Sequence, residues 1–283
     1  MSVVVNTNLS SAMVQRNLSR ATLELGKTMQ KLSTGMKINS AGDDAAGLSL
    51  SEKLKSHIDS SEITKQNALS GINMLQVAEG DLSVIQNNLQ RMRDLSIQAA
   101  NGVYSSSERK FIDQEFQQRV KEIDRISTSS QFSDLFLLNG SLGTAGTGLK
   151  LQIGTYATPA TTNTIDISSS FVTTNTLALG LSTAKVTTVA TALSAITSLD
   201  AAITTISSRR SLIGANINRL QSTIERIDTR KENLQASYST IRDTDVAKET
   251  ANLSKQQVLQ QSGAMLLKQA NQSTQIALQL LQG

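Results

Sequence analysis

The sequence predicts a mainly α protein: a long antiparallel helical bundle or coiled coil with a small β-hairpin insert and with paired N- and C-termini. Three observations lead to this fold class. Apolar residues recur every seven positions over long stretches, and the middle of the chain changes to Thr, Ser, Gly and Asn. The 283 residues include only one Pro, five Phe, three Tyr and no Trp. Because Pro inside a helix costs about 3 kcal/mol or more, almost the whole chain is free to be helical.

The first long helix is predicted from a sevenfold pattern that ends near Ala99. Alternate spacings of three and four place these residues on one helix face, with Ser96 as the single polar interruption: Leu75, Ala78, Leu82, Ile85, Leu89, Met92 and Ala99. Asn101 and Gly102 then predict a turn. Ser105 with Glu108 three residues later is typical of a capping box. A second helix should therefore begin there and end near Ser127.

A longer sevenfold series lies toward the C-terminus. Its eight successive members are Ala192, Leu199, Ile206, Ile213, Leu220, Ile227, Leu234 and Ile241. A helix of about 50 residues would be about 75 Å long. Its apolar stripe would be exposed if the helix stood alone, so it must pack on partner helices.

Both termini repeat the pattern more loosely and with little charge. Leu18, Leu25 and Leu32 share one face of the N-terminal segment, and Leu259, Leu266 and Leu280 keep sevenfold spacing at the C-terminus. These six leucines are candidate residues for pairing of the two ends. The ends then pair either as a two-helix hairpin in a monomer or as a pair that is further buried against other copies. The scarcity of charge on the flanks favours self-assembly.

The middle of the chain, from about 131 to 188, predicts the β insert. Leu149, Leu151 and Ile153 alternate with polar residues, as do Ile165 and Ile167. Such alternation is typical of short strands, here forming one hairpin around the loop that holds Pro159. We therefore expect two domains. Residues 1–44 with 242–283 would form a terminal coiled-coil core domain, and 45–241 a helical rod domain that includes the insert.

Composition limits the function classes. The net charge is +4 and basic residues are scattered among acidic ones, whereas nucleic acid binding needs a concentrated basic patch. The absence of Cys excludes disulfides and thiol chemistry. The first residues lack the basic and apolar regions of a cleaved secretion signal, and no apolar run approaches the roughly 20 residues of a membrane span. We expect no nucleic acid partner and no membrane partner.

No catalytic or cofactor-binding constellation emerges from the sequence. His57 is the only histidine, which removes the usual histidine triads and the two-histidine zinc motif. Asp43 and Asp44 stand together in a small-residue frame, where they are either a helix start or part of a metal site. Glu52, the next acid, is more than two helical turns away, so we favour a helix start and packing joint. We expect no enzyme activity, cofactor or metal.

Several long stretches resemble the signature sequences of bacterial flagellins. They are LSTGMKINSAGDDAAGLSLSEKL (32–54), NNLQRMRDLSIQAANG (87–102), QRVKEIDRIS (118–127), LQIG (151–154) and ASYSTIRDTDVAKETANLSKQQVLQQSGAMLLKQANQ (236–272). The resemblance covers roughly residues 1–155 and 180–283. Hook–filament junction proteins are similar at both ends and are the alternative; the continuous match from Gln90 to Gly102 favours flagellin.

The resemblance implies a structural subunit of the flagellar filament, exported unfolded through the flagellar export apparatus and polymerised outside the cell for motility. Implied partners are further copies of the chain, an export chaperone, the filament cap, hook-associated junction proteins and the host Toll-like receptor specific for flagellin. The insert is too short for the large outer domains of many flagellins. The residues that match the receptor-contacting and subunit-packing segment are Gln90, Arg91, Asp94, Leu95 and Glu115.

Overall fold

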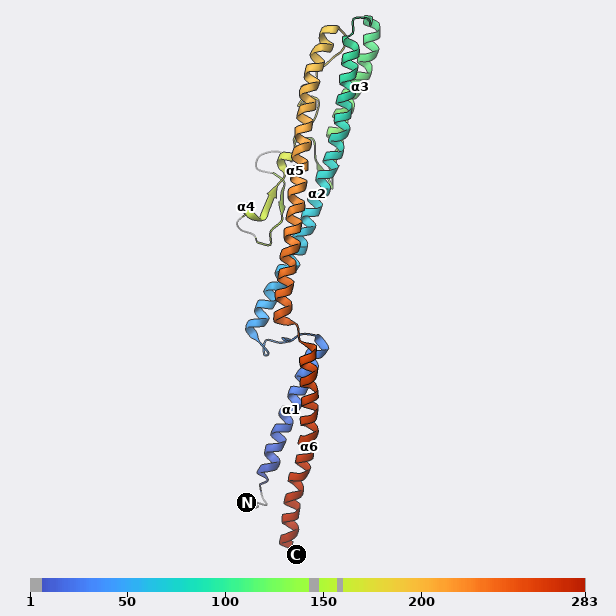
Figure 1. The fold of residues 1–283 in the computed structure, drawn as a ribbon. Coiled ribbons are helices and arrows are strands. Elements are labelled where there is room, and N and C mark those ends of the chain that lie inside the picture. Colours follow the sequence, from blue (N-terminus) through green and yellow to red (C-terminus); the bar gives the residue numbers. More distant parts are fainter. Residues whose placement is uncertain (1–6, 143–147, 157–159, 283) are drawn as a thin grey trace. The chain divides into compact units, whose positions relative to one another are not determined.

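The computed structural model describes residues 7–142, 148–156 and 160–282, with side chains given only outside 160–161 and 273–282. The described elements follow one another along the chain as coloured in Figure 1. The helices are α1 (Leu9–Thr34), α2 (Ala45–Ala100), α3 (Ser106–Ser129), α4 (Ala160–Asn163), the 3₁₀ turn η1 (Ser168–Ser170), α5 (Val189–Arg242) and α6 (Val246–Gln282). The strands are β1 (Gln131–Phe132), β2 (Leu135–Phe136), β3 (Lys150–Gln152) and β4 (Thr164–Asp166).

The chain divides into two compact units. One comprises Met1–Ile58 with Glu232–Gly283, and the other comprises Asp59–Lys231. The sequence placed the domain limits at 44/45 and 241/242, at helix ends. Both limits of the compact units instead fall inside the long helices α2 and α5.

The helices and turns predicted from the sevenfold patterns are confirmed. α2 ends at Ala100, one residue before the Asn-Gly turn, and α5 extends over the whole C-terminal series. The capping box that starts α3 is present, because the Ser105 side chain accepts from the Glu108 backbone and the Glu108 carboxylate accepts from the Ser105 backbone. The mainly helical fold class with a small β insert is therefore correct.

One continuous apolar core fills the unit 59–231. It takes residues from α2, α3, α5 and the insert, and these helices lie side by side within the unit (Figure 1). The sevenfold series of α2, from Leu75 to Ala99, is buried throughout, and Leu75, Ile85, Leu89 and Met92 are fully inaccessible to solvent. In α5, Ile206 and other members of the long series are equally buried. The sevenfold stripes of α2 and α5 thus face a core that α3 and the insert complete.

Four ion pairs join α2 to α5 along this unit. As the residue number rises in α2 it falls in α5, so the two helices run antiparallel. The pairs are Glu62–Lys231, Lys65–Asp228, Glu79–Arg210 and Arg93–Asp200, with N···O distances of 2.5, 2.8, 2.6 and 2.6 Å. Exposed pairs of this kind contribute little stability individually, but together they mark one alignment of the helices.

The insert contains the predicted hairpin and one that the sequence did not reveal. β3 pairs antiparallel with β4, with Leu151 opposite Ile165; Pro159, in the expected loop, lies outside the described residues. β1 pairs with β2 across a two-residue turn at Ser133 and Asp134, whose φ angles are +48° and +67°. Two-residue hairpin turns with positive φ usually carry Asn-Gly or Asp-Gly, so Ser-Asp gave no recognisable signal.

The expectation that no segment is apolar enough to span a membrane needs correction for α5. An 18-residue window of this helix has mean hydropathy 1.5, which by length and composition could cross a membrane. Ala192, Leu199 and Ile206 of this helix are fully buried in the core of the unit 59–231. Its high hydropathy is therefore accounted for, at these positions, by packing between helices.

Candidate assembly surface

In the unit formed by Met1–Ile58 and Glu232–Gly283, here called the terminal unit, α1 packs against α6. The side chains of α1 that are withdrawn from solvent alternate by four and three residues: Val14, Leu18, Ala21, Leu25, Thr28 and Leu32. The corresponding residues of α6 are Leu253, Gln256, Gln260, Gly263, Leu267 and Ala270. The helices meet closely, since a Cβ added to Gly263 would lie 3.3 Å from Leu18 Cδ1. Asn8 Nδ2 also donates to the Ala270 carbonyl at 2.9 Å.

The predicted set of pairing leucines is thus divided by the structure. Leu18, Leu25 and Leu32 lie half-buried in the seam with α6. Leu259 and Leu266 do not, because they are 47% and 58% exposed on α6, and the seam passes through Gln260 and Leu267 instead. The C-terminal series is therefore displaced by one residue from the face that meets α1. The Leu280 side chain lies outside the described residues.

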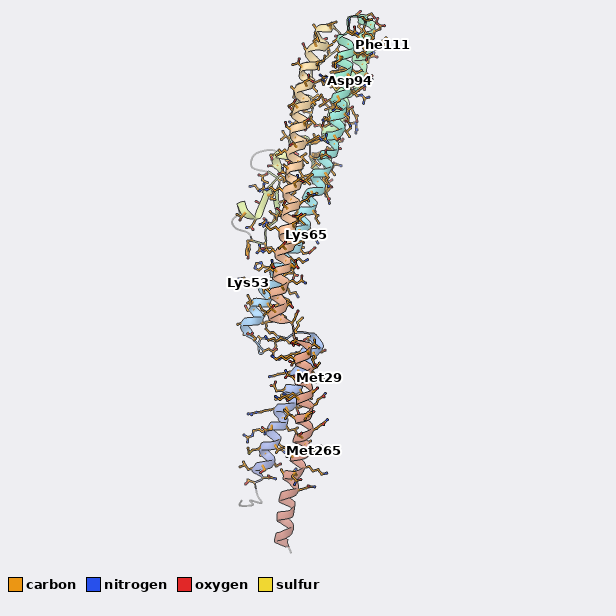
Figure 2. The ribbon with its side chains drawn as sticks, in the orientation of Figure 1. Met29, Lys53, Lys65, Asp94, Phe111 and Met265 are labelled. Carbon is orange, nitrogen blue, oxygen red and sulfur yellow. The ribbon has the colours of Figure 1, made fainter. Side chains whose placement is uncertain are left out.

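Large apolar side chains remain exposed on both helices of the terminal unit, among them Met29 and Met265 (Figure 2). Those with at least 47% exposure are Leu9, Met13, Leu23 and Met29 on α1, and Val246, Val258, Leu259, Met265 and Leu266 on α6. Burying one such side chain completely stabilises an association by about 1.5–3 kcal/mol. A second copy of the chain could cover this surface, which we call the terminal apolar surface.

A compact joint connects the four helix ends of the terminal unit. α1 ends at Gly35, whose φ of +70° suits a residue without a Cβ. The carbonyl of Gly35 accepts from Thr244 N at 3.0 Å, and Lys37 N donates to the Arg242 carbonyl at 2.7 Å. The Arg242 guanidinium donates to Ser51 and to the Glu52 carboxylate of α2. These bonds fix the segment after α1 against the end of α5 and the start of α2.

The two adjacent acids stabilise different parts of this joint. Asp44 Oδ1 accepts from the backbone N–H of Gly47 at 2.9 Å, as the N-cap of α2. Asp43 Oδ2 instead accepts from the N–H groups of Asn39 and Ser40. These backbone hydrogen bonds hold the pKa of the Asp43 carboxyl below its usual value. Within the described ranges no group of three or more metal-ligating side chains occurs, here or elsewhere.

The proposed receptor-contacting residues lie in the unit 59–231, but not all on its surface. Gln90, Arg91 and Asp94 are exposed on α2, and the Arg91 guanidinium binds both oxygens of Glu115 of α3 at 3.0 and 3.2 Å. Leu95 is only 2% exposed. α3 widens the buried face of α2 beyond the sevenfold series, so Leu95 lies in the core of the unit while Gln90, Arg91 and Asp94 lie on its surface.

The Arg91–Glu115 pair is ionised at neutral pH. The hydrogen bond from Arg91 holds the pKa of the Glu115 carboxyl below its usual value. A carboxyl with a lowered folded-state pKa contributes stability above its unfolded pKa, and that contribution is lost as the pH falls through the lowered value. Since both side chains are at least 40% exposed, the pair matters more as a charged surface feature than for stability.

Comparison with known proteins decides the family. The model of the bacterial flagellin N-terminal helical region matches residues 5–142, and that of the C-terminal helical region matches 196–281. The chain is also 40% identical over 285 residues to the flagellar filament 33 kDa core protein of Treponema phagedenis, covering 99% of this chain and 100% of that protein. The chain belongs to the flagellin family. It is a structural subunit of the bacterial flagellar filament.

Other relatives support the compact form of this flagellin. The flagellin of Halalkalibacterium halodurans is 37% identical over 279 residues, covering 99% of this chain and 100% of that protein. Full-length relatives of the same size confirm that no large outer domain is inserted. A putative flagellar hook-associated protein from Vibrio parahaemolyticus has a similar fold, with 16% identity, a TM-score of 0.58, and coverage of 71% of this chain and 100% of that one.

Proposed function

We propose that this flagellin polymerises by burying its terminal apolar surface on neighbouring copies, so that residues 1–44 with 242–283 form the core of the filament and 45–241 its outer rod. The main support for this proposal is that Leu259 and Leu266 point away from α1 on α6, where they are 47% and 58% exposed. The seam with α1 is occupied by glutamine, glycine and alanine together with Leu253 and Leu267. Leu259, Met265 and Leu266 are thereby left for contacts between subunits.

Replacing Leu266 tests this proposal at a single position. Leu266→Gln removes an exposed apolar side chain that only a neighbouring copy would cover. The loss of its burial should weaken association by about 1.4 kcal/mol or more per subunit, so we expect the critical concentration for polymerisation to rise about tenfold. The far-UV circular dichroism of the monomer should not change. Sedimentation of filaments at a series of protein concentrations measures the effect.

Lys268→Gln, at an exposed polar position of the same helix, is the matched control and should polymerise as the parent does. Equal critical concentrations for Leu266→Gln and the parent would contradict burial of α6 between subunits.

We further propose that the chain is exported unfolded by the flagellar export apparatus, with an export chaperone, and is added beneath a filament cap beyond hook-associated junction proteins. The absence of Cys and the single Pro support this route, because neither disulfides nor several slow prolyl isomers would delay threading and refolding. The expected product is an extracellular filament that serves motility. Fractionation of cells lacking the export apparatus should find the protein retained inside them.

The alternative is that the chain is a hook–filament junction protein. The fold alone does not distinguish this alternative from a filament subunit. Full-length identity of 40% to a filament core protein favours the filament subunit. Electron microscopy of the purified chain distinguishes the two, because a junction protein should not grow long filaments by itself.

Recognition by the host Toll-like receptor for flagellin is proposed for the polar surface formed by Gln90 and the charged side chains of Arg91, Asp94 and Glu115. Leu95 is buried, so it would contribute only indirectly, by packing α2 in the core of the unit. Arg91→Ala removes both hydrogen bonds to Glu115, so we expect receptor signalling by the monomer to fall about tenfold or more. A reporter-cell dose response measures this.

The control for Arg91→Ala is Arg125→Ala, which breaks a comparable exposed pair with Glu122 on α3. Its dose response should match that of the parent. An Arg91→Ala monomer that signals as strongly as the parent would show that this polar surface serves only subunit packing.

A further inference from the structure

A small cavity lies in the unit 59–231, where the insert meets α2 and α5. Its volume is about 60 Å³, and its walls come from all three parts of the chain. α2 contributes Thr64, the insert contributes Gly154 and Thr155, and α5 contributes Arg226 and Arg230. None of its lining residues belongs to the terminal apolar surface or to the Arg91–Glu115 pair, so neither role described above accounts for it.

Two guanidinium groups reach this cavity from one helix face. Arg226 and Arg230 are four residues apart on α5, a spacing that places side chains next to each other. Neither forms an ion pair with any carboxylate in the described part of the chain. Arg230 lies over the Tyr156 ring, 5.8 Å from its centre, which favours one position of the guanidinium through a cation–π contact.

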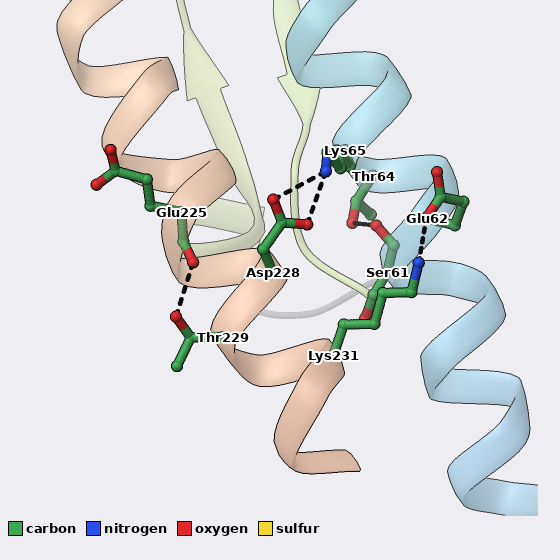
Figure 3. A network of polar contacts seen from close by, with 8 residues as sticks. All are labelled: Ser61, Glu62, Thr64, Lys65, Glu225, Asp228, Thr229 and Lys231. Atoms are coloured by element: carbon green, nitrogen blue, oxygen red, sulfur yellow. Dashed lines mark hydrogen bonds and ion pairs between the residues drawn. The ribbon is translucent and has the colours of Figure 1, made fainter. Parts of the chain in front are cut away.

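Two acids in the same part of α2 and α5 are already paired with lysines. Asp228 accepts from Lys65 at 2.8 Å through both oxygens, and Glu62 pairs with Lys231 (Figure 3). Glu225 does not line the cavity and extends from α5 on the side away from α2 (Figure 3). The local carboxylates therefore leave the positive charge of the two arginines uncompensated.

The wall of the cavity also contains a buried hydroxyl without a partner. Thr155 Oγ1 is inaccessible to solvent and makes no hydrogen bond with the described residues. An unsatisfied buried hydroxyl costs about 1–3 kcal/mol. A threonine hydroxyl can donate to an anionic oxygen, and the same cavity holds two groups that can only donate.

We propose that this cavity binds a small oxyanion, a carboxylate or phosphate group, held by Arg226 and Arg230 with the Thr155 hydroxyl as a further donor. Guanidinium groups match the paired oxygens of such anions and form charge-assisted hydrogen bonds with them. The oxyanion comes either from solution or from a carboxylate side chain of a neighbouring copy. The second source rests on the proposed polymerisation.

Titration of inorganic phosphate into the monomeric full-length chain tests the site. We expect saturable binding by calorimetry and a higher melting temperature with phosphate than with chloride at equal ionic strength. The Arg226→Gln/Arg230→Gln double variant should bind about tenfold or more weakly. Thr155→Val, which keeps both charges, should also weaken binding. Arg219→Gln is the matched control, because Arg219 is exposed on the same helix and lies outside the cavity.

The proposal is overturned if the parent shows no saturable phosphate binding, as expected of a cavity that holds water only, or if Arg219→Gln weakens binding as much as the double variant does. The variants must keep the circular dichroism of the parent. Should the double variant not fold, Thr155→Val and the parent titration still decide the outcome.

Filaments distinguish the two sources of the anion. If parent filaments no longer bind phosphate and the double variant raises the critical concentration for polymerisation, a neighbouring carboxylate occupies the site. If filaments bind phosphate as monomers do, the anion comes from solution. Failure of the parent to form filaments would contradict the proposed function but would leave the monomer titration valid.

Discussion

Deletion of residues 260–283 is expected to abolish filament growth. The deletion removes Gln260, Gly263, Leu267 and Ala270, which are four of the six α6 residues in the seam with α1, together with Met265 and Leu266 of the terminal apolar surface. α1 would lose its partner over that length, and an isolated helix of 26 residues with two buried side chains is held mainly by such packing. Electron microscopy and sedimentation of the truncated protein should show no polymer.

The unit 59–231 should remain folded in the truncated protein, because its core lies wholly within that unit. Its helicity and its cooperative thermal transition provide the control. Deletion of residues 1–30 should have the same two consequences, since it removes the other side of the seam. Normal filaments from either truncated chain would contradict pairing of the termini as the basis of assembly.

Replacement of Phe116 by alanine is expected to have the largest effect on the stability of the unit 59–231. Phe116 of α3 is fully buried in the core, and removing a buried phenylalanine ring costs about 3–5 kcal/mol through lost burial and the cavity left behind. Urea unfolding of the monomer, followed by circular dichroism, should show a lower midpoint with an unchanged slope.

Phe111 provides a matched control on the same helix. It is 69% exposed, so Phe111→Ala should change the free energy of unfolding by no more than about 0.5 kcal/mol. Similar losses for the two variants would show that the three-helix core is not organised around α3 as described.

Much of the fold could be predicted because its signals are local and repeated. Sevenfold spacing located α2 and α5, and the Ser105–Glu108 pair located the start of α3. The alternation around Leu151 and Ile165 located the β3–β4 hairpin. Each of these features depends on residues near one another in sequence, where periodicity and capping chemistry determine the structure.

The parts that could not be predicted depend on which surfaces meet. Leu95 is buried because a third helix covers α2, and Asn88, seven residues earlier, is buried for the same reason. On α6 the usual association of leucine with the intrachain seam is misleading, because Gln260 and Gly263 lie toward α1 while Leu266 lies outward. A subunit of a polymer distributes its apolar residues between its own core and its neighbours, and a single sequence does not separate the two.

The four ion pairs between α2 and α5 have a consequence for misalignment. A sevenfold apolar pattern tolerates sliding by seven residues, since at most positions one apolar residue replaces another. Such a slide would place Ser207 or Leu193 opposite Arg93, and Tyr238 or Ile224 opposite Glu62. Glu79 would face isoleucine and Lys65 would face glutamine after a slide in either direction. All four charges on α2 would thus lose their partners at once, which penalises the nearest wrong alignment and leaves a newly refolding chain a single favoured way to close.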